Sequence, residues 1–241
     1  MEQKNQWKRV WNRREDFLDG IDPGDSKSVF LELKRIDGFD IADGGIPYEG
    51  LVAQYEETKK ELCLRGEDSI FEVGCGAGAN LYLFRRDGME VGGLDYSETL
   101  IGILQKVLPR GEIRECICAE AADCPTDLVY DAVLSNSVFS YFPDLSYAEK
   151  VLERMLAKSR RTIGILDVHD KEKEQAFKEY RIRTTEDYET RYKDLPKLFY
   201  PRSFFEEFAG KHGLELRFKE STVEGYWNNA FIFNCFMQRQ P

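Results

Sequence analysis

A glycine-rich turn that follows a buried acidic residue is the stretch of this chain best suited to chemistry. Residues 70–78 read IFEVGCGAG, which predicts a buried strand, a tight turn and the start of a helix. Glycines at such a turn let the backbone come close to a ligand, because no Cβ intrudes. The free N–H groups at the start of the next helix can then bind an electron-rich group. This stretch therefore predicts a site for a nucleotide-like cofactor.

Two classes of cofactor compete for this turn. Gly74, Gly76 and Ala79 satisfy a loose dinucleotide pattern, which is weak evidence on its own. However, Gly78 extends the turn to G-x-G-x-G, and Glu72 places a carboxylate beside it. That carboxylate would repel a pyrophosphate and attract the ammonium group of a methionine. The turn therefore favours S-adenosylmethionine over a nicotinamide dinucleotide.

A second acidic residue follows at the spacing expected of a ribose ligand. Asp95 ends the next predicted strand and lies about 20 residues after Gly74, as ribose-binding carboxylates do. A carboxylate suits this role because it can accept hydrogen bonds from two hydroxyl groups at once. Tyr96 comes next, and it either lies against an adenine ring or packs as an ordinary partly buried tyrosine.

Alternating strands and helices must position these residues. The chain predicts strands at 69–73, 89–94, 112–118, 131–135 and 162–168, with helices at 78–86, 97–107 and 147–156 between them. Such alternation predicts a parallel sheet. A helix at 204–209, with Ser203 and Glu206 as a capping box, then precedes strands at 214–218 and 230–237. The link between those two strands is too short for a helical crossover, so they should pair antiparallel. The expected fold is therefore α/β and doubly wound, with a mostly parallel seven-stranded sheet, helices on both faces and a C-terminal antiparallel hairpin.

Two segments fall outside this alternation. Residues 1–50 read as helices separated by turns, with Trp7 and Trp11 at helical spacing, and they are expected to form an N-terminal helical cap. Residues 169–202 are rich in Tyr and Arg and follow the strand at 162–168, at the edge where α/β sheets place their ligands. We expect residues 51–241 to form the main domain, with a lid insertion at about 169–202. Trp7 and Trp11 could equally be packing residues.

The acidic strand, glycine turn, second acid and terminal hairpin together resemble the class I S-adenosylmethionine-dependent methyltransferases, a Rossmann-like fold. The resemblance covers about residues 50–238. It implies that the methionine end of the cofactor is held by Glu72, Gly74, Gly76 and Gly78, and the ribose by Asp95. S-adenosyl-L-methionine would be the cofactor and S-adenosyl-L-homocysteine the product.

The same resemblance implies contacts at two further strand ends. After the third strand, Glu120 and Ala121 would meet the adenine, although the family usually has Asp where Glu120 stands, and Asp123 is the alternative. Tyr96 could also contact the adenine. After the fourth strand, Asn136 and Ser137 would line the transfer site beneath the sulfonium; their alternative is a simple turn.

His169 is the candidate catalytic base. Methyl transfer is an in-line displacement, so much of the catalysis is positioning, and a base is needed only when the nucleophile must lose a proton. His169 follows the fifth strand, and its ordinary pKa suits proton removal near neutrality. Its alternative is a surface histidine in a charged stretch. Asp167 is the other side chain that could point toward the site.

We therefore predict an enzyme that transfers a methyl group to an oxygen or nitrogen of a small metabolite. No Asn/Asp-Pro-Pro-Tyr/Phe motif follows the fourth strand, which counts against amino groups of bases or glutamine as acceptors. The alternatives are a nicotinamide-dependent oxidoreductase, methylation of a protein, and a non-catalytic module with the same pocket. The acceptor itself is left open.

The composition of the chain indicates which kinds of partner to expect. The chain has 241 residues and a net charge of −10, whereas binding to nucleic acid depends on clustered Lys and Arg. We expect a small-molecule acceptor and no nucleic acid. Arg181, Arg183 and Arg191 in the lid segment favour an anionic acceptor.

Location and metal content follow from what the sequence lacks. No apolar run is long enough to span a bilayer, and residues 1–6 have no apolar core of a secretory leader. We therefore expect a cytoplasmic protein with no membrane partner. The six cysteines and two histidines show no zinc-site spacing, so reduced thiols and no metal are expected. The oligomeric state is left open.

Overall fold

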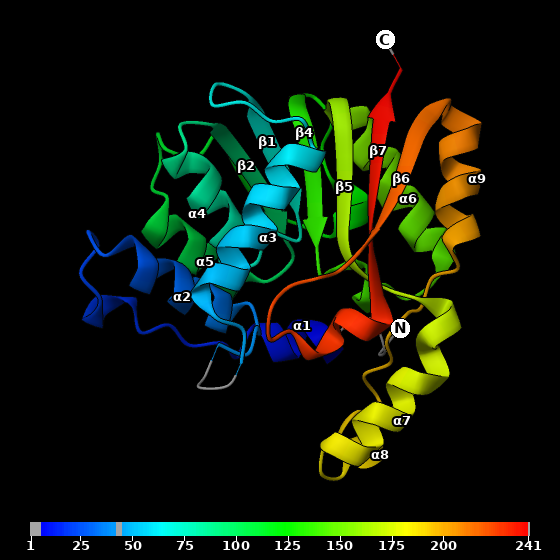
Figure 1. The fold of residues 1–241 in the computed structure, drawn as a ribbon. Helices are drawn as coiled ribbons and strands as arrows, with labels where there is room; N and C mark the ends of the chain where they lie inside the picture. Colours follow the sequence, from blue (N-terminus) through cyan, green and yellow to red (C-terminus); the bar gives the residue numbers. More distant parts are fainter. Residues whose placement is uncertain (1–5, 42–44, 241) are drawn as a thin grey trace.

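The chain folds into one sheet with helices on both faces (Figure 1). The computed structural model describes residues 6–41 and 45–240. The strands are β1 (Ser69–Val73), β2 (Glu90–Asp95), β3 (Glu115–Cys118), β4 (Tyr130–Asn136), β5 (Ser159–His169), β6 (Leu214–Glu220) and β7 (Ile232–Arg239). The helices are α1 (Gln6–Trp11), α2 (Ser26–Ile36), α3 (Tyr48–Glu61), α4 (Ala79–Arg86), α5 (Glu98–Val107), α6 (Leu145–Lys158), α7 (Glu174–Thr184), α8 (Tyr188–Arg191) and α9 (Arg202–His212).

The strand order confirms the predicted fold class. The seven strands lie in the order β3-β2-β1-β4-β5-β7-β6. The first five are parallel, and β7 inserts antiparallel between β5 and β6. The order reverses between β1 and β4, and open α/β sheets bind ligands at the carboxyl ends of the strands on either side of such a reversal.

Two apolar layers hold the sheet. Successive residues of a strand point to opposite faces, so Ile70 joins one buried cluster and Phe71 the other. The first cluster contains side chains of α2, α3, α4 and α5, and the second contains those of α6 and α9. All five residues of β1 are buried. The glycine turn therefore begins from the most enclosed strand of the sheet.

Several predicted boundaries need correction. The strand predicted at 112–118 begins only at Glu115, and β7 begins at Ile232 because residues 227–231 form a 3-10 helix. The capping box at Ser203 and Glu206 is wrong. Helix α9 already begins at Arg202 with Pro201 as its N-cap, so Ser203 lies inside the first turn, where its hydroxyl group cannot cap.

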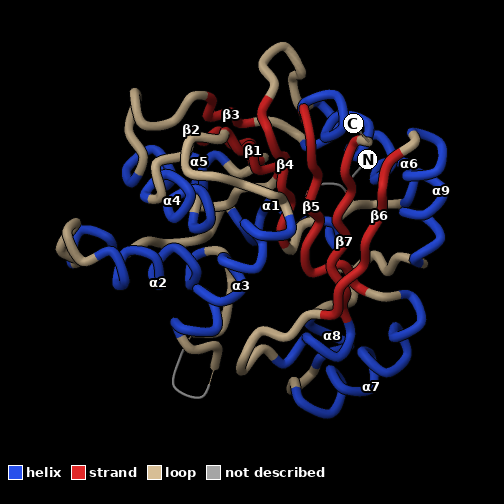
Figure 2. Tube along the Cα trace, turned by 45° about the horizontal axis from the view of Figure 1, so that its top comes forward, coloured by secondary structure: helices blue, strands red, loops and turns tan. Residues whose placement is uncertain are grey.

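The segments outside the alternation meet at one edge of the sheet. Figure 1 shows α1 across the carboxyl edge of the parallel strands, and Figure 2 shows α7 and α8 extending beyond the lower ends of β5, β6 and β7. The two segments touch, since the indole Nε1 of Trp7 donates a hydrogen bond to the carbonyl oxygen of Pro196 at 3.3 Å. In the described part of the chain, no helix is long and apolar enough to cross a membrane.

Candidate active site

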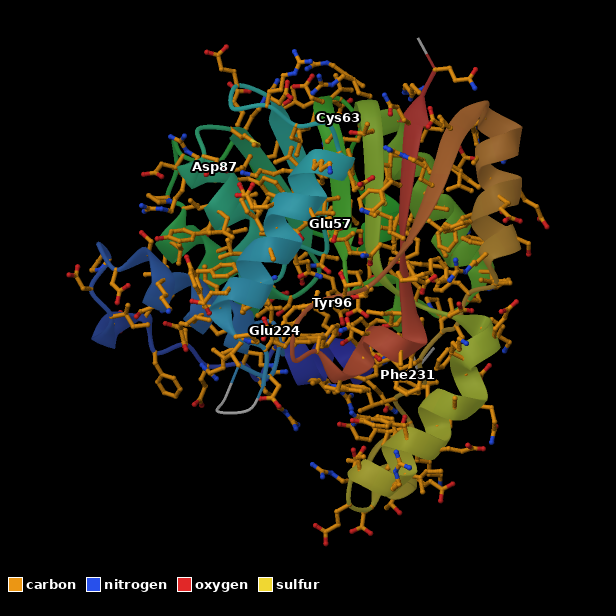
Figure 3. The ribbon with its side chains drawn as sticks, in the orientation of Figure 1. Glu57, Cys63, Asp87, Tyr96, Glu224 and Phe231 are labelled. Carbon is orange, nitrogen blue, oxygen red and sulfur yellow. The ribbon has the colours of Figure 1, made fainter. Side chains whose placement is uncertain are left out.

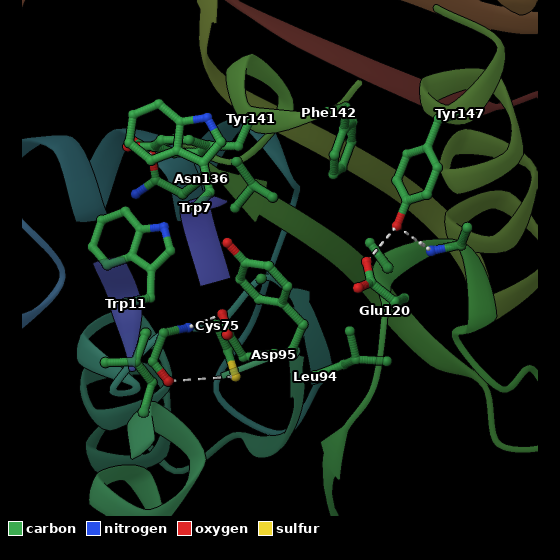
Figure 4. Close-up of a pocket in the computed structure, with 18 of the residues that line it drawn as sticks. Trp7, Trp11, Cys75, Leu94, Asp95, Glu120, Asn136, Tyr141, Phe142 and Tyr147 are labelled. Atoms are coloured by element: carbon green, nitrogen blue, oxygen red, sulfur yellow. Dashed lines mark hydrogen bonds between the residues drawn. The ribbon is translucent and has the colours of Figure 1, made fainter. Parts of the chain in front are cut away.

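A cavity of about 1070 Å³ lies along the carboxyl ends of β1, β2 and β4. Figure 4 shows part of its lining, and Figure 3 places Tyr96 near the same edge of the sheet. The cavity brings together most of the predicted site residues: Glu72, Gly74, Gly76, Asp95, Tyr96, Glu120, Ala121, Asn136 and Ser137. Gly78 and His169 are not in its lining.

The glycine turn lines the cavity and lies very close to side chains of neighbouring segments. Gly76 has a φ of +56°, and a Cβ there would lie 2.2 Å from Oδ1 of Asp37. Gly78 has a φ of +89° and caps α4; a Cβ there would lie 2.3 Å from the side chain of Leu104. Gly78 therefore shapes the turn by packing against α5, whereas Gly76 leaves room for a carboxylate above the turn.

The end of the cavity beside β1 is lined by polar side chains, and one of their oxygen atoms has no hydrogen-bond partner. The carboxyl group of Glu72 is buried; its Oε1 accepts a hydrogen bond from Nδ2 of Asn80 at 2.6 Å, and its Oε2 has no partner. Nζ of Lys34, also buried, donates to Oδ1 of Asn80 at 2.9 Å. Burial raises the pKa of Glu72 to about 8 and lowers that of Lys34. An acceptor and a donor thus face one small space, as an amino acid zwitterion would require.

Asp37 is a functional candidate that the sequence analysis missed. It follows α2, and its Oδ1 accepts a hydrogen bond from the backbone N–H of Ala77 at 2.7 Å. Burial raises its pKa to about 7, and the charge of Asp95 adds to the shift. The sequence signal was present, since Asp37-Gly38 marks the end of a helix, but nothing in the sequence linked that turn to the glycines.

Asp95 is oriented by the backbone. Its Oδ2 accepts a hydrogen bond from the N–H of Gly76 at 3.0 Å, and its Oδ1 accepts one from the N–H of Ser97 at 2.8 Å. Burial raises the pKa of Asp95 to about 6. Each carboxylate oxygen can accept a further bond, so both remain able to receive vicinal hydroxyl groups.

The side of the cavity beyond β3 holds the predicted adenine residues. The hydroxyl group of Tyr147 donates to Oε2 of Glu120 at 3.0 Å, and it accepts a hydrogen bond from the N–H of Ala122 at 3.4 Å (Figure 4). Burial raises the pKa of both Tyr96 and Tyr147. Glu120 is therefore fixed by α6, the helix that carries Tyr147.

Ser137, which is half-buried, and the buried Asp167 form a pair at the ends of β4 and β5. Oγ of Ser137 donates to Oδ2 of Asp167 at 2.6 Å. The same carboxylate accepts hydrogen bonds from the hydroxyl group of Tyr226 at 2.6 Å and from Nδ2 of Asn228 at 2.9 Å. Both Ser137 and Asp167 have positive φ angles, of 60° and 58°. Asp167 therefore reaches the cavity through Ser137, which lines it.

His169 lies behind the wall of the cavity. Its ring packs between Phe177 and Phe199, with centroid distances of 4.9 and 5.1 Å, and the residue is only 4% exposed. Its Nε2 lies 3.2 Å from Nδ2 of Asn228, and its Nδ1 has no partner. Burial holds the pKa of His169 well below its usual range. The base role of His169 stays a prediction, and this placement gives the ring no direct access to a ligand.

Aromatic rings and one lysine line the cavity beyond β4. Trp7 and Trp11 meet the ring of Tyr141 edge-on, at centroid distances of 4.7 and 5.6 Å (Figure 4). Nζ of Lys197 lies 3.4 Å from the centroid of Tyr141 and donates to Oγ of Ser140 at 3.1 Å. The sequence analysis named neither Lys197 nor Tyr141 as a site residue. No cluster of three or more potential metal ligands occurs in the described residues.

Comparisons with known proteins agree with this geometry. A family model described as a methyltransferase domain matches residues 71–162. The comparison with curated proteins gives no match.

Similar solved structures cover most or all of the chain. The magnesium protoporphyrin IX methyltransferase of Synechocystis PCC 6803, with bound S-adenosylhomocysteine, is 16% identical, covers 99% of this chain and 100% of its own, and has a TM-score of 0.65. The geranyl diphosphate C-methyltransferase of Streptomyces coelicolor A3(2) is 15% identical, with coverages of 100% and 99% and a TM-score of 0.65. The plantazolicin methyltransferase BpumL is 17% identical, with coverages of 80% and 82% and a TM-score of 0.56. At these identities the likeness shows the fold.

Proposed function

We propose that this chain, a class I S-adenosylmethionine-dependent methyltransferase, transfers a methyl group to an oxygen or nitrogen of a small metabolite. The methyltransferase-domain match and the sheet order confirm two predictions from the sequence: the resemblance to the class I methyltransferases and the assignment as an enzyme. The acceptor class, the atom that receives the methyl group and the site residues are our proposals.

One observation carries the cofactor assignment. Glu72 and Asp95 lie in one cavity, on either side of a glycine turn, and each has a carboxylate oxygen able to accept a further hydrogen bond. Glu72 and Lys34 would hold the amino and carboxylate groups of the methionine moiety, and Asp95 would hold the ribose. When bound, the cofactor would supply an electrophilic methyl group on a sulfonium.

The remaining predicted residues have positions consistent with their proposed roles. Tyr96, Glu120 and Ala121 line the side where the adenine would lie, and Asn136 and Ser137 line the wall beside the transferred group. Gly74 and Gly76 would contact the methionine end, whereas Gly78 would act only by shaping the turn.

The size of the cavity supports a small acceptor beside the cofactor. Ligand sites commonly measure about 300–1,000 Å³, and this cavity of about 1070 Å³ is larger. The structurally similar enzymes are described as acting on a porphyrin, geranyl diphosphate and plantazolicin, so the fold accommodates several kinds of small molecule. An anionic acceptor stays a prediction from Arg181, Arg183 and Arg191, none of which lines the cavity.

The segments at 1–50 and 169–202 are proposed to close over the acceptor. Their contact through Trp7 and Pro196 joins two parts of the chain that are far apart in sequence. A closed lid would exclude water from the transfer site. A cytoplasmic location and the absence of a nucleic-acid partner stay predictions from the sequence.

Calorimetric titration with S-adenosylhomocysteine tests the cofactor assignment. Binding to the wild type is expected, and Asp95→Ala should weaken it about 10- to 100-fold, because two charge-assisted hydrogen bonds to the ribose would be lost. Asp127→Ala, a change outside the cavity lining, is the control. No binding to the wild type, or equal binding to Asp95→Ala, would overturn the assignment.

A further inference from the structure

We propose that Lys197 is a catalytic residue that takes the proton from the acceptor, and that the acceptor is a flat aromatic ring bearing a weakly acidic hydroxyl group. This inference rests on the methyl transfer proposed above and adds the substrate class and the base.

The position of Lys197 is the first argument. Its side chain lines the cavity, and Nζ lies over the ring of Tyr141 at 3.4 Å from the centroid and 5.0 Å from that of Trp7. Among the described residues, Oγ of Ser140 is the one hydrogen-bond partner of Nζ, at 3.1 Å. The amine can form three hydrogen bonds, so it can still bind a group in the cavity.

The charges around Lys197 are the second argument. Within the described ranges, no carboxylate lies at ion-pair distance from its Nζ. The charged groups that act on it are Asp167 from β5, which favours the ammonium form, and Arg181 from α7, which opposes it. Burial outweighs Asp167 and lowers the pKa of Lys197 to about 7. A substantial fraction is therefore an uncharged amine near neutral pH, able to accept a proton.

The aromatic walls are the third argument. Nζ lies against the rings of Tyr141 and Trp7, and Trp11 meets Tyr141 edge-on, so aromatic rings bound the space beside Nζ. Such walls favour a flat ring, which can stack on them or meet them edge-on. An aromatic hydroxyl group is acidic enough to give its proton to an amine, whereas a carboxylic acid is already ionised and would need no base.

The step balances without a further reactant. The hydroxyl proton passes to Nζ of Lys197, and the oxygen forms a bond to the methyl carbon. The carbon–sulfur bond breaks, and its electron pair stays on sulfur, which becomes neutral. The ammonium group so formed returns its proton to solvent. Ser137, whose hydroxyl group donates to Asp167, lines the same cavity.

Binding of 4-nitrophenol to protein saturated with S-adenosylhomocysteine tests the inference. The ionised form of this probe absorbs at longer wavelength than the neutral form, so its spectrum reports the position of the proton. At a pH below the probe's own pKa, the wild type should bind it with the spectrum of the phenolate. Lys197→Met should lose that spectrum and bind the probe about 10- to 100-fold more weakly. Lys197→Arg, a permanent cation, should keep the phenolate spectrum.

Controls separate this inference from the cofactor assignment. Lys193→Met changes an exposed lysine of the same segment and should behave as the wild type. Affinity for S-adenosylhomocysteine, measured on each variant, reports folding and cofactor binding independently. The proposal is overturned if the wild type leaves the probe neutral or unbound, if Lys197→Met binds it unchanged, or if benzoate competes as well as the probe does.

Discussion

Lys34 offers the sharpest test of how the cofactor would be held. It is 2% exposed, donates to Asn80 and is the one cation that lines the cavity beside the glycine turn in the described chain. If its ammonium group binds the carboxylate of the methionine moiety, Lys34→Met removes one charge-assisted hydrogen bond. Such a bond contributes about 1.5–3 kcal/mol, so affinity for S-adenosylhomocysteine should fall about 10- to 100-fold.

The assay compares two ligands that differ only at this end. S-adenosylhomocysteine carries the amino acid group, whereas methylthioadenosine keeps the adenosine and sulfur but lacks that group. Calorimetric titration of Lys34→Met should show the loss for the first ligand and a change of less than about threefold for the second. Lys27→Met is the matched control, because Lys27 lies on the exposed face of the same helix, α2.

Two results would contradict this expectation in different ways. Equal losses for both ligands would mean that Lys34→Met disturbs the cavity as a whole. Unchanged binding of S-adenosylhomocysteine would refute the contact. The thermal midpoint of Lys34→Met identifies the first case, since a large fall would indicate a folding defect.

Two further predictions concern buried titratable groups. Burial raises the pKa of Glu72 to about 8, so the folded chain keeps a proton that the unfolded chain releases; the wild type should lose stability relative to Glu72→Gln as the pH rises from about 5 to 8 in melting experiments. A constant difference would contradict the shift. His169 packs between Phe177 and Phe199, so His169→Ala should lower stability by about 2–4 kcal/mol in urea titrations, with affinity for S-adenosylhomocysteine unchanged. An unaltered urea midpoint would argue against this packing role.

Much of the fold could be predicted because local patterns and the sheet agree. The strand at 69–73 was predicted with its observed bounds, since five buried positions bracketed by polar residues and glycines leave few alternatives. Asp95 could be placed because its distance from the glycine turn is set by one βαβ unit. The N-cap predicted at Ser203 was wrong because a capping pattern does not determine which residue begins the helix, and α9 begins at Arg202.

The residues that were missed lie on segments whose position depends on tertiary contacts. Lys34 appears in the sequence as a charged residue on an amphipathic helix, where a lysine normally faces water. Only the packing of α2 against α4 turns it toward Asn80. Lys197 stands in the insertion, far from Tyr141 in sequence, and no periodicity links the two. His169 was favoured by its position after β5, but the chain turns its ring away from the cavity toward α7.

The acids around the glycine turn suggest how the site would distinguish donor from product. Glu72 and Asp95 are buried and Asp37 is half-buried, and burial raises the pKa of all three carboxyl groups. The charges of Asp37 and Asp95 raise the pKa of Glu72 further, so ionising these groups in the free protein is costly. A sulfonium in the cavity would offset that cost, since opposite charges attract strongly where water is excluded. Once the methyl group had left, the sulfur would be neutral and that attraction would be gone, while the proposed hydrogen bonds to the ribose and the amino acid group would persist. The same acids that would draw in the donor would therefore help to release the product.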